Sequence, residues 1–220
     1  MIKIATAQDV RNLYGECNAI YLRNYEGDPT VPHAQLTRGF HSDGYLDSPL
    51  VLSNPECADA LASELAVRIY VLDYRPDWVI GSAYSAITFS YKVAEKLRAR
   101  HGYTKKDPAD QSRMQWQEMA IPENARIFQV EELIVSFGTT LEVRRAVAEE
   151  NPEPVDFYPT VATIIYRPPR LDAPRPLKVI ALAEWEIKSW PPDQCPLCKQ
   201  GSRALRPKNR AHWAELTAKR

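Results

Sequence analysis

The chain has 220 residues, of which 28 are Lys or Arg, 28 are Asp or Glu, and 45% are apolar. This length and composition allow a sizeable globular core, and the balanced charge excludes an overall basic field that would recruit nucleic acid or an acidic membrane. The first residues lack the order of a secretory signal and no apolar run approaches the roughly 20 residues of a membrane span, so we expect a cytoplasmic protein without a membrane partner.

The first third of the chain predicts two helices around a turn-rich segment. Apolar residues recur at helical spacing over residues 6–23, with Thr6 as the cap. Residues 24–52 hold several Gly, Pro and Asp residues around two short extended pieces. A second helix is predicted over residues 53–72, capped by Ser53 or Asn54.

From residue 77 onward, short apolar runs alternate with amphipathic helices. Their order is DWVIGSA, YSAITFSYKVAEKLRARHG, RIFQVEEL, GTTLEVRRAVAEENP, TVATIIYRPPR and LKVIALAEW. This alternation predicts an α/β fold with a mostly parallel, twisted sheet flanked by helices. The polar stretch 103–125 is longer than most loops and predicts either a short hairpin or a functional lid.

Two cysteines near the end of the chain have the spacing of a zinc knuckle. Cys195 and Cys198 supply only two of the four ligands of a tetrahedral zinc site, so His212, Cys17 or Cys57 would have to complete it. We favour a reduced pair without metal, because four scattered cysteines in a chain of this length indicate free thiols. A zinc-stapled interaction module is the alternative.

Two loops follow predicted strands and lead into helices, where ligands of open α/β sheets bind. The first is Gly81–Ala86 and the second is Val135–Thr140. Backbone N–H groups of such a turn, aimed along a helix dipole, bind phosphate, and Ser136, Thr139 and Thr140 add hydroxyl groups.

Glu131 and Glu132 stand directly before the second loop. Carboxylates do not bind phosphate, but they accept hydrogen bonds from ribose hydroxyls or help to hold Mg²⁺. Acids followed by a phosphate cradle therefore indicate a sugar phosphate as the ligand. The alternative is a solvated pair of Glu residues before an ordinary strand-to-helix turn.

VEELIVSFGTT, residues 130–140, resembles the phosphoribosyl-pyrophosphate motif of type I phosphoribosyltransferases. DWVIGSAYSAITFSYKVAEKL resembles the pyrophosphate loop and helix of the same family. LTRGFHSDGYLDSPLVLSNPECADALASELA resembles the N-terminal hood of orotate phosphoribosyltransferases, and TVATIIYRPPR resembles their strand that ends in an Arg. The resemblance implies an N-terminal helix and hood over residues 1–52, a core over 53–184, and a Pro-rich, basic tail over 185–220 packed on the core.

The resemblance also implies an activity, which is transfer of a 5-phosphoribosyl group from phosphoribosyl pyrophosphate to a nucleobase, with orotate as the best candidate and Mg²⁺ as cofactor. Glu131 and Glu132 would take the ribose hydroxyls, and Glu132 is also a catalytic candidate. The 5′-phosphate would be held by Ser136, Phe137, Gly138, Thr139 and Thr140.

The remaining implied roles concern the leaving group and the base. Ala83 and Tyr84 would present backbone to pyrophosphate, and Arg167 and Tyr45 would bind the base, with Leu46 beside it. A basic lid would carry Lys105, Lys106 and Arg113 as catalytic groups and would reach into the second subunit of a homodimer.

The sequence departs from the family pattern at several positions. Glu132 is one methylene longer than the Asp that the family prefers, and Thr37 stands where orotate enzymes often have Lys. Phe137 replaces a glycine, and the bulk of Phe137 would hinder close backbone approach or a positive φ. An alternative function is therefore a catalytically silent regulatory protein that binds phosphoribosyl pyrophosphate or a nucleotide.

Overall fold

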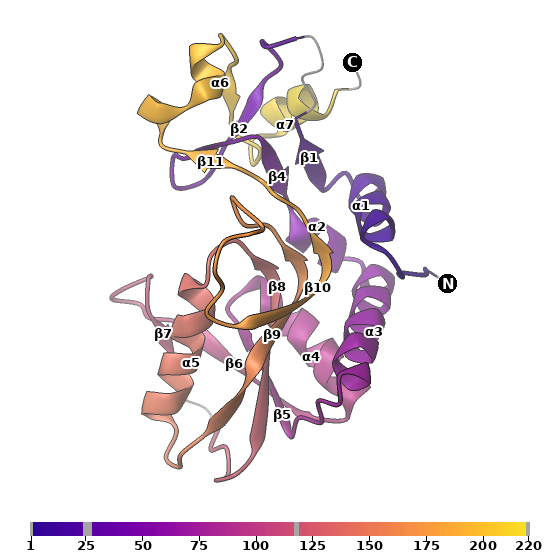
Figure 1. The fold of residues 1–220 in the computed structure, drawn as a ribbon, viewed down its shortest axis with the longest axis vertical. Coiled ribbons are helices and arrows are strands. Elements are labelled where there is room, and N and C mark those ends of the chain that lie inside the picture. The colour runs from indigo at the N-terminus through magenta and orange to yellow at the C-terminus, as the bar shows by residue number, and fades with distance from the viewer. Residues whose placement is uncertain (1, 24–27, 117–118, 219–220) are drawn as a thin grey trace.

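The computed structural model describes residues 2–23, 28–116 and 119–218, and its centre is a six-stranded sheet (Figure 1). The strand order is β10-β9-β8-β5-β6-β7, and all neighbours are parallel except β7, which pairs antiparallel with β6. The strands are β5 (Trp78–Ser82), β6 (Arg100–Lys106), β7 (Met114–Gln115), β8 (Arg126–Ile134), β9 (Asp156–Tyr166) and β10 (Lys178–Glu184). The predicted α/β fold with a mostly parallel sheet is confirmed.

Helices cover both faces of this sheet because its strands are apolar on both sides. Helices α3 (Pro55–Val71) and α4 (Ser85–Leu97) pack on one face, where Leu65 and Phe89 meet Phe128 and Val130. Helix α5 (Gly138–Glu150) packs on the opposite face against the neighbouring side chains of the same strands. The chain leaves β5 toward β6 and returns on the other side of β5 as β8, so the topological switch point lies between β5 and β8.

A smaller unit joins the two ends of the described chain and lies above the large sheet in Figure 1. Its four strands run in the order β11-β3-β2-β12, so two N-terminal strands lie between two C-terminal strands. The strands are β2 (His33–Gln35), β3 (His41–Ser42), β11 (Ser189–Trp190) and β12 (Ala204–Leu205). The remaining elements are α1 (Ala7–Glu16), β1 (Ile20–Leu22), β4 (Gly44–Leu46), α2 (Ser48–Leu52), η1 (Pro192–Gln194), α6 (Pro196–Lys199) and α7 (Arg210–Thr217).

Two predicted helices end earlier than the sequence pattern indicates. Helix α1 is capped by Thr6 as expected but stops at Glu16, and residues 20–22 form β1, which pairs with β4. Helix α4 stops at Leu97 because Arg98 takes a left-handed conformation with φ of 57°, and residues 100–106 form β6. In both cases backbone pairing with a partner distant in sequence decides the structure.

The other predicted elements are found close to their expected limits. Asn54 is the residue that caps α3, through a hydrogen bond to its side chain from the N–H of Glu56. Among the described helices, none combines the length and the apolar character needed to cross a bilayer.

Candidate active site

Glu131 of β8 lies at the switch point and is almost completely buried, with 3% of its surface exposed. The hydroxyl of Ser82, the last residue of β5, donates to one carboxylate oxygen, and Gln129 donates to the other at 2.8 Å. Arg144 of α5 in turn donates to Gln129 at 3.0 Å. Both oxygens of Glu131 are therefore held in place by side chains, one from β5 and one from β8 itself.

The environment of Glu131 disfavours its charge. Burial, followed by the negative charge of Glu132, raises the pKa of Glu131 to about 8, while the hydrogen bonds from Ser82 and Gln129 and the charge of Lys106 act against this rise. The ligand-free site therefore favours the neutral form of this carboxyl group more than water does. A cation or another positive charge that enters the site lowers this pKa and favours the carboxylate.

Glu132 projects to the opposite face of the sheet, because successive side chains of a strand alternate. Burial raises the pKa of Glu132, and a hydrogen bond from the side chain of Ser85, the first residue of α4, lowers it. The two acids of the motif thus meet different elements, Glu131 meeting residues of β5 and β8, and Glu132 meeting α4.

The phosphate-loop residues lie at the N-terminus of α5, where unsatisfied backbone N–H groups and the helix dipole favour an anion. Ser136, Gly138 and Thr139 are exposed there, whereas Thr140 is buried. A Cβ added to Gly138 would meet only the hydroxyl oxygen of Ser136, 3.9 Å away. The start of α5 is therefore open to a ligand.

Phe137 does not block this loop by an unusual backbone conformation. Its φ is −83°, which any residue adopts, so the expected demand for a positive φ is wrong. Its ring packs beside Tyr166, with 6.0 Å between the ring centroids, in the apolar cluster that contains Ile134 and Val161. The Phe137 ring thus packs against apolar side chains of the large sheet.

The loop after β5 approaches helix α4 closely. A Cβ at Gly81 would lie 2.2 Å from the hydroxyl of Ser90, so this glycine is required by strand–helix packing. The N–H of Ala83 donates to the carbonyl of Thr104 at 3.0 Å, and the Ala83–Tyr84 peptide bond is cis. The Tyr84 side chain is 76% exposed. The N–H of Ala83 thus already has a partner within the chain. The next side chain of the loop, that of Tyr84, faces solvent.

The stretch predicted as a hairpin or a lid is a hairpin of β6 and β7, in which Lys105 pairs with Gln115 and Lys106 with Met114. Glu142 of α5 fixes this hairpin, because it accepts from the N–H of Met114 at 3.1 Å and lies 3.6 Å from Nε of Arg113. The charge of Lys106 acts on Glu131, which places the base of the hairpin beside the switch point.

Arg167 follows β9 and is buried, with 7% of its surface exposed. Within the part of the chain that the structure describes, its Nε and Nη1 atoms have no hydrogen-bond partner. Burial lowers its pKa, and the negative charge of Asp43 in the hood segment opposes this effect. A buried guanidinium with free donors is a binding group for an anion.

Tyr45 also borders a cavity of about 300 Å³ in the small unit. The cavity lies between the β2–β3 turn, which includes Thr37, and residues 206–208 of the tail. Leu46, expected beside the base, is buried in the main core. The structure therefore brings Tyr45, but not the side chain of Leu46, to an open space.

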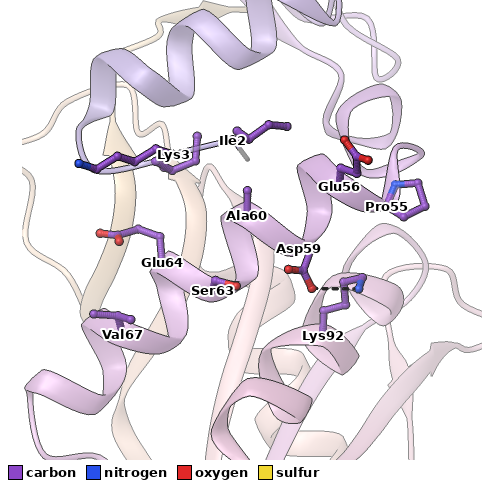
Figure 2. Close-up of a pocket in the computed structure, with 11 residues that line it drawn as sticks. Ile2, Lys3, Pro55, Glu56, Asp59, Ala60, Ser63, Glu64, Val67 and Lys92 are labelled. Carbon is purple, nitrogen blue, oxygen red and sulfur yellow. Dashed lines mark hydrogen bonds and ion pairs between the residues drawn. The ribbon is translucent and has the colours of Figure 1, made fainter.

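A larger cavity of about 660 Å³ lies elsewhere, between residues 2–4, α3 and α4 (Figure 2). Its walls carry an ion pair between Lys92 and Asp59 at 3.3 Å. None of the candidate site residues borders it. Its size alone does not make it a candidate active site.

Sequence reasoning missed the residues that hold the candidates in place, namely Ser82, Gln129, Arg144 and Asp43. Ser82 and Gln129 have a readable signal, because polar side chains within or at the end of buried strands need partners. Arg144 and Asp43 carry no such signal, since charged residues on a helix and in a turn are ordinarily solvated.

No family model matches the chain. The chain is 32% identical to an orotate phosphoribosyltransferase of Caldicellulosiruptor bescii over 179 residues, which cover 81% of this chain and 89% of that protein. It is 29% identical over 188 residues to an orotate phosphoribosyltransferase of Wolinella succinogenes, covering 82% and 91%. The crystal structure of orotate phosphoribosyltransferase from Aeropyrum pernix has a TM-score of 0.55 at 16% identity, covering 80% of this chain and 93% of that one, and shows likeness of fold.

The matches with these relatives cover about four fifths of the chain, and the predicted resemblance to type I phosphoribosyltransferases is confirmed. The chain belongs to the orotate phosphoribosyltransferase family.

Proposed function

We propose that this protein transfers a 5-phosphoribosyl group from phosphoribosyl pyrophosphate to orotate. The observation that carries the choice of base is Arg167, a buried guanidinium whose Nε and Nη1 donors have no partner among the described residues. Orotate bears a carboxylate, which would supply acceptor oxygens and a compensating negative charge to this buried guanidinium. Asp43, whose negative charge acts on Arg167, and Tyr45 are the hood groups proposed to border this contact.

The ribose phosphate fits the other end of the site. The N-terminus of α5, with Ser136, Gly138, Thr139 and Thr140, receives the 5′-phosphate through backbone N–H groups and hydroxyls. Glu131 at the switch point is the acceptor for ribose hydroxyls, and Glu132 on the other face of β8 is held by Ser85 beside the pyrophosphate loop. Residues 83–84, with Lys105, Lys106 and Arg113 of the hairpin, are proposed to contact pyrophosphate.

Mg²⁺ fits the donor set of this site, because the buried and half-buried polar groups at the switch point are carboxyl and hydroxyl oxygens. Of the two acids, Glu131 at the switch point is the residue that would help to hold it, together with oxygens of the substrate. When bound, the ion supplies positive charge that neutralises the pyrophosphate leaving group.

The reaction passes through a transition state with positive charge on the ribose ring, so the chain must position the base and stabilise the departing pyrophosphate. Arg167 orients orotate, the α5 N-terminus fixes the ribose phosphate, and the basic hairpin faces the leaving group. We further propose a cytoplasmic homodimer in which this hairpin reaches the neighbouring subunit's site; sedimentation at micromolar concentration tests the dimer.

The test is calorimetric titration of the purified chain with phosphoribosyl pyrophosphate and Mg²⁺, followed by orotate, with pyrophosphate release as the readout. We expect release with orotate and none with uracil, which lacks the carboxylate. Binding of phosphoribosyl pyrophosphate without release on any base would instead establish a regulatory binding protein.

A further inference from the structure

Four side chains from opposite ends of the chain meet in the small unit. They are His33 on β2, His41 on β3, and Cys195 and Cys198 at the two ends of the turn that forms α6. One ligand atom from each lies within 4.8 Å of all the others. His33 and Cys195 are in contact although they are 162 positions apart in the sequence.

Four distances within the cluster are close to those of a tetrahedral metal site. The two histidine nitrogens, Nε2 of His33 and Nδ1 of His41, are 3.1 Å apart. Nε2 of His33 is 3.6 Å from each cysteine sulfur, and Nδ1 of His41 is 3.2 Å from Sγ of Cys198. Bonds of about 2.3 Å to sulfur and 2.0–2.1 Å to nitrogen, at tetrahedral angles, separate the ligand atoms by roughly 3.3–3.8 Å.

A buried serine fixes the tautomer of His33. The hydroxyl of Ser202 donates its single proton to the carbonyl of Val31 at 2.7 Å, so toward Nδ1 of His33, also 2.7 Å away, it can act only as an acceptor. Nδ1 therefore carries the ring proton, and Nε2 presents its lone pair to the two sulfurs. This outer hydrogen bond is the arrangement that orients metal-bound histidines.

The local backbone also suits a metal-binding turn. Helix α6 begins with Pro196, and Gly201, with φ of +85°, turns the chain back immediately after it. The N–H of Lys199 donates to the carbonyl of Cys195, and that of Gly201 to the carbonyl of Cys198. The two sulfurs thus point toward the histidines of the adjacent strands.

We propose that His33, His41, Cys195 and Cys198 bind one structural zinc ion. Two sulfurs and two imidazole nitrogens in tetrahedral reach select zinc, and four protein ligands leave no open position for a substrate. The expected alternative ligands lie elsewhere, because Nδ1 of His212 accepts from the N–H of Arg206, and the side chains of Cys17 and Cys57 are neighbours of each other.

The ion would hold together a sheet whose strands are too short to be stable alone. Strands β3, β11 and β12 have two residues each and β2 has three, and the ligands come from both inner strands and from the segment that joins the outer two. Binding energy of such a site is folding energy. This proposal does not depend on the transferase activity.

The first experiment measures metal in the full-length chain, produced without a histidine tag and purified without chelator. We expect one zinc per chain by elemental analysis. After exchange with cobalt(II), we expect the visible absorption of a tetrahedral site with thiolate charge-transfer bands. A chain that contains no zinc and shows no such cobalt spectrum would overturn the proposal, whatever the behaviour of the variants.

Variants then locate the ion. Cys198→Ser and His41→Ala are expected to lose most of the bound zinc, and Cys17→Ser, which alters a cysteine outside the cluster, is expected to retain it. Zinc that remains at one per chain in both ligand variants would place the ion elsewhere and overturn the assignment. If a ligand variant fails to fold, the cobalt spectrum of the unmodified chain decides alone.

Discussion

The hydroxyl of Ser82 on β5 donates a hydrogen bond to the buried carboxyl group of Glu131 on β8 and so joins the two strands at the topological switch point. The contact holds an ionisable group where water is largely excluded, which raises its pKa to about 8. A group with this property links protein stability to pH in a direction opposite to that of most carboxyl groups.

The first prediction concerns Glu131→Gln. An unfolded Glu titrates near about pH 4.3, whereas the folded chain keeps the proton of Glu131 up to about pH 8. Between these values the folded state binds more protons, so this group makes the free energy of unfolding fall as pH rises. We expect the free energy of unfolding of the variant, taken relative to that of the wild type, to increase by more than about 1 kcal/mol from roughly pH 5 to pH 8.

Urea denaturation across this range measures the effect, with Glu123→Gln, an exposed substitution, as the control that follows the wild-type curve. Parallel stability curves for Glu131→Gln and the wild type would show that Glu131 is ionised in the folded, ligand-free chain.

The second prediction compares two glycines. In Gly138→Ala the new methyl group meets only the Ser136 hydroxyl at 3.9 Å, so we expect unchanged stability but binding of phosphoribosyl pyrophosphate weakened by about tenfold or more, or about 1.4 kcal/mol. In Gly81→Ala the methyl group would lie 2.2 Å from Ser90, and we expect a loss of about 1–3 kcal/mol of stability.

Urea denaturation and calorimetric titration of both variants separate the two effects. Unaltered affinity in Gly138→Ala would mean that the phosphate does not approach the start of α5 closely.

The third prediction concerns Arg167→Met. Removing a buried guanidinium whose Nε and Nη1 lack partners relieves a desolvated charge, so stability should not fall. The KM for orotate should rise by at least about 30-fold, since loss of one partner of a buried charged pair costs roughly 2–5 kcal/mol. Binding of phosphoribosyl pyrophosphate, measured by calorimetry, is the internal control. A normal KM for orotate would exclude Arg167 from the base site.

The fourth prediction concerns the attachment of the hairpin to α5. Glu142→Ala removes the acceptor for the Met114 N–H and the ion pair with Arg113. We expect a loss of about 1–2 kcal/mol of stability and faster amide exchange over residues 105–116. The matched change is Glu149→Ala, which removes an exposed partner of Arg145 and should cost less than about 0.5 kcal/mol. Equal exchange rates in the two variants would contradict a role for Glu142 in holding the hairpin.

The parallel core could be predicted because its signals are local. Apolar runs such as RIFQVEEL, followed at once by GTTLEVRRAVAEE, specify a strand and a helix without reference to the rest of the chain. The first part of strand β6, residues 100–102, was predicted as helix because it continues the helical spacing of α4, and pairing with β5 makes it a strand. Strand β1 was missed for the same reason, since it depends on pairing with β4.

The site shows the same division. The acids and the loop before α5 could be identified from one short motif, whereas the partner of the Ala83 N–H depends on where β6 lies beside β5. The four-residue cluster of the small unit could not be completed from sequence, because its histidines and cysteines are more than 150 positions apart. Spacing within the cysteine pair shows a knuckle but does not show which residues face it.

The interleaved order of the small sheet imposes a sequence of events during synthesis. Strands β2 and β3 emerge from the ribosome early, yet each has an outer neighbour, β12 or β11, that is among the last elements to be made. The large parallel sheet already has all its strands by residue 184, so it can fold while the β2–β3 pair still presents open edges. Closure of the small sheet needs β11 and β12, so a chain released before residue 189 would carry every strand of the large sheet but would leave both edges of the β2–β3 pair open.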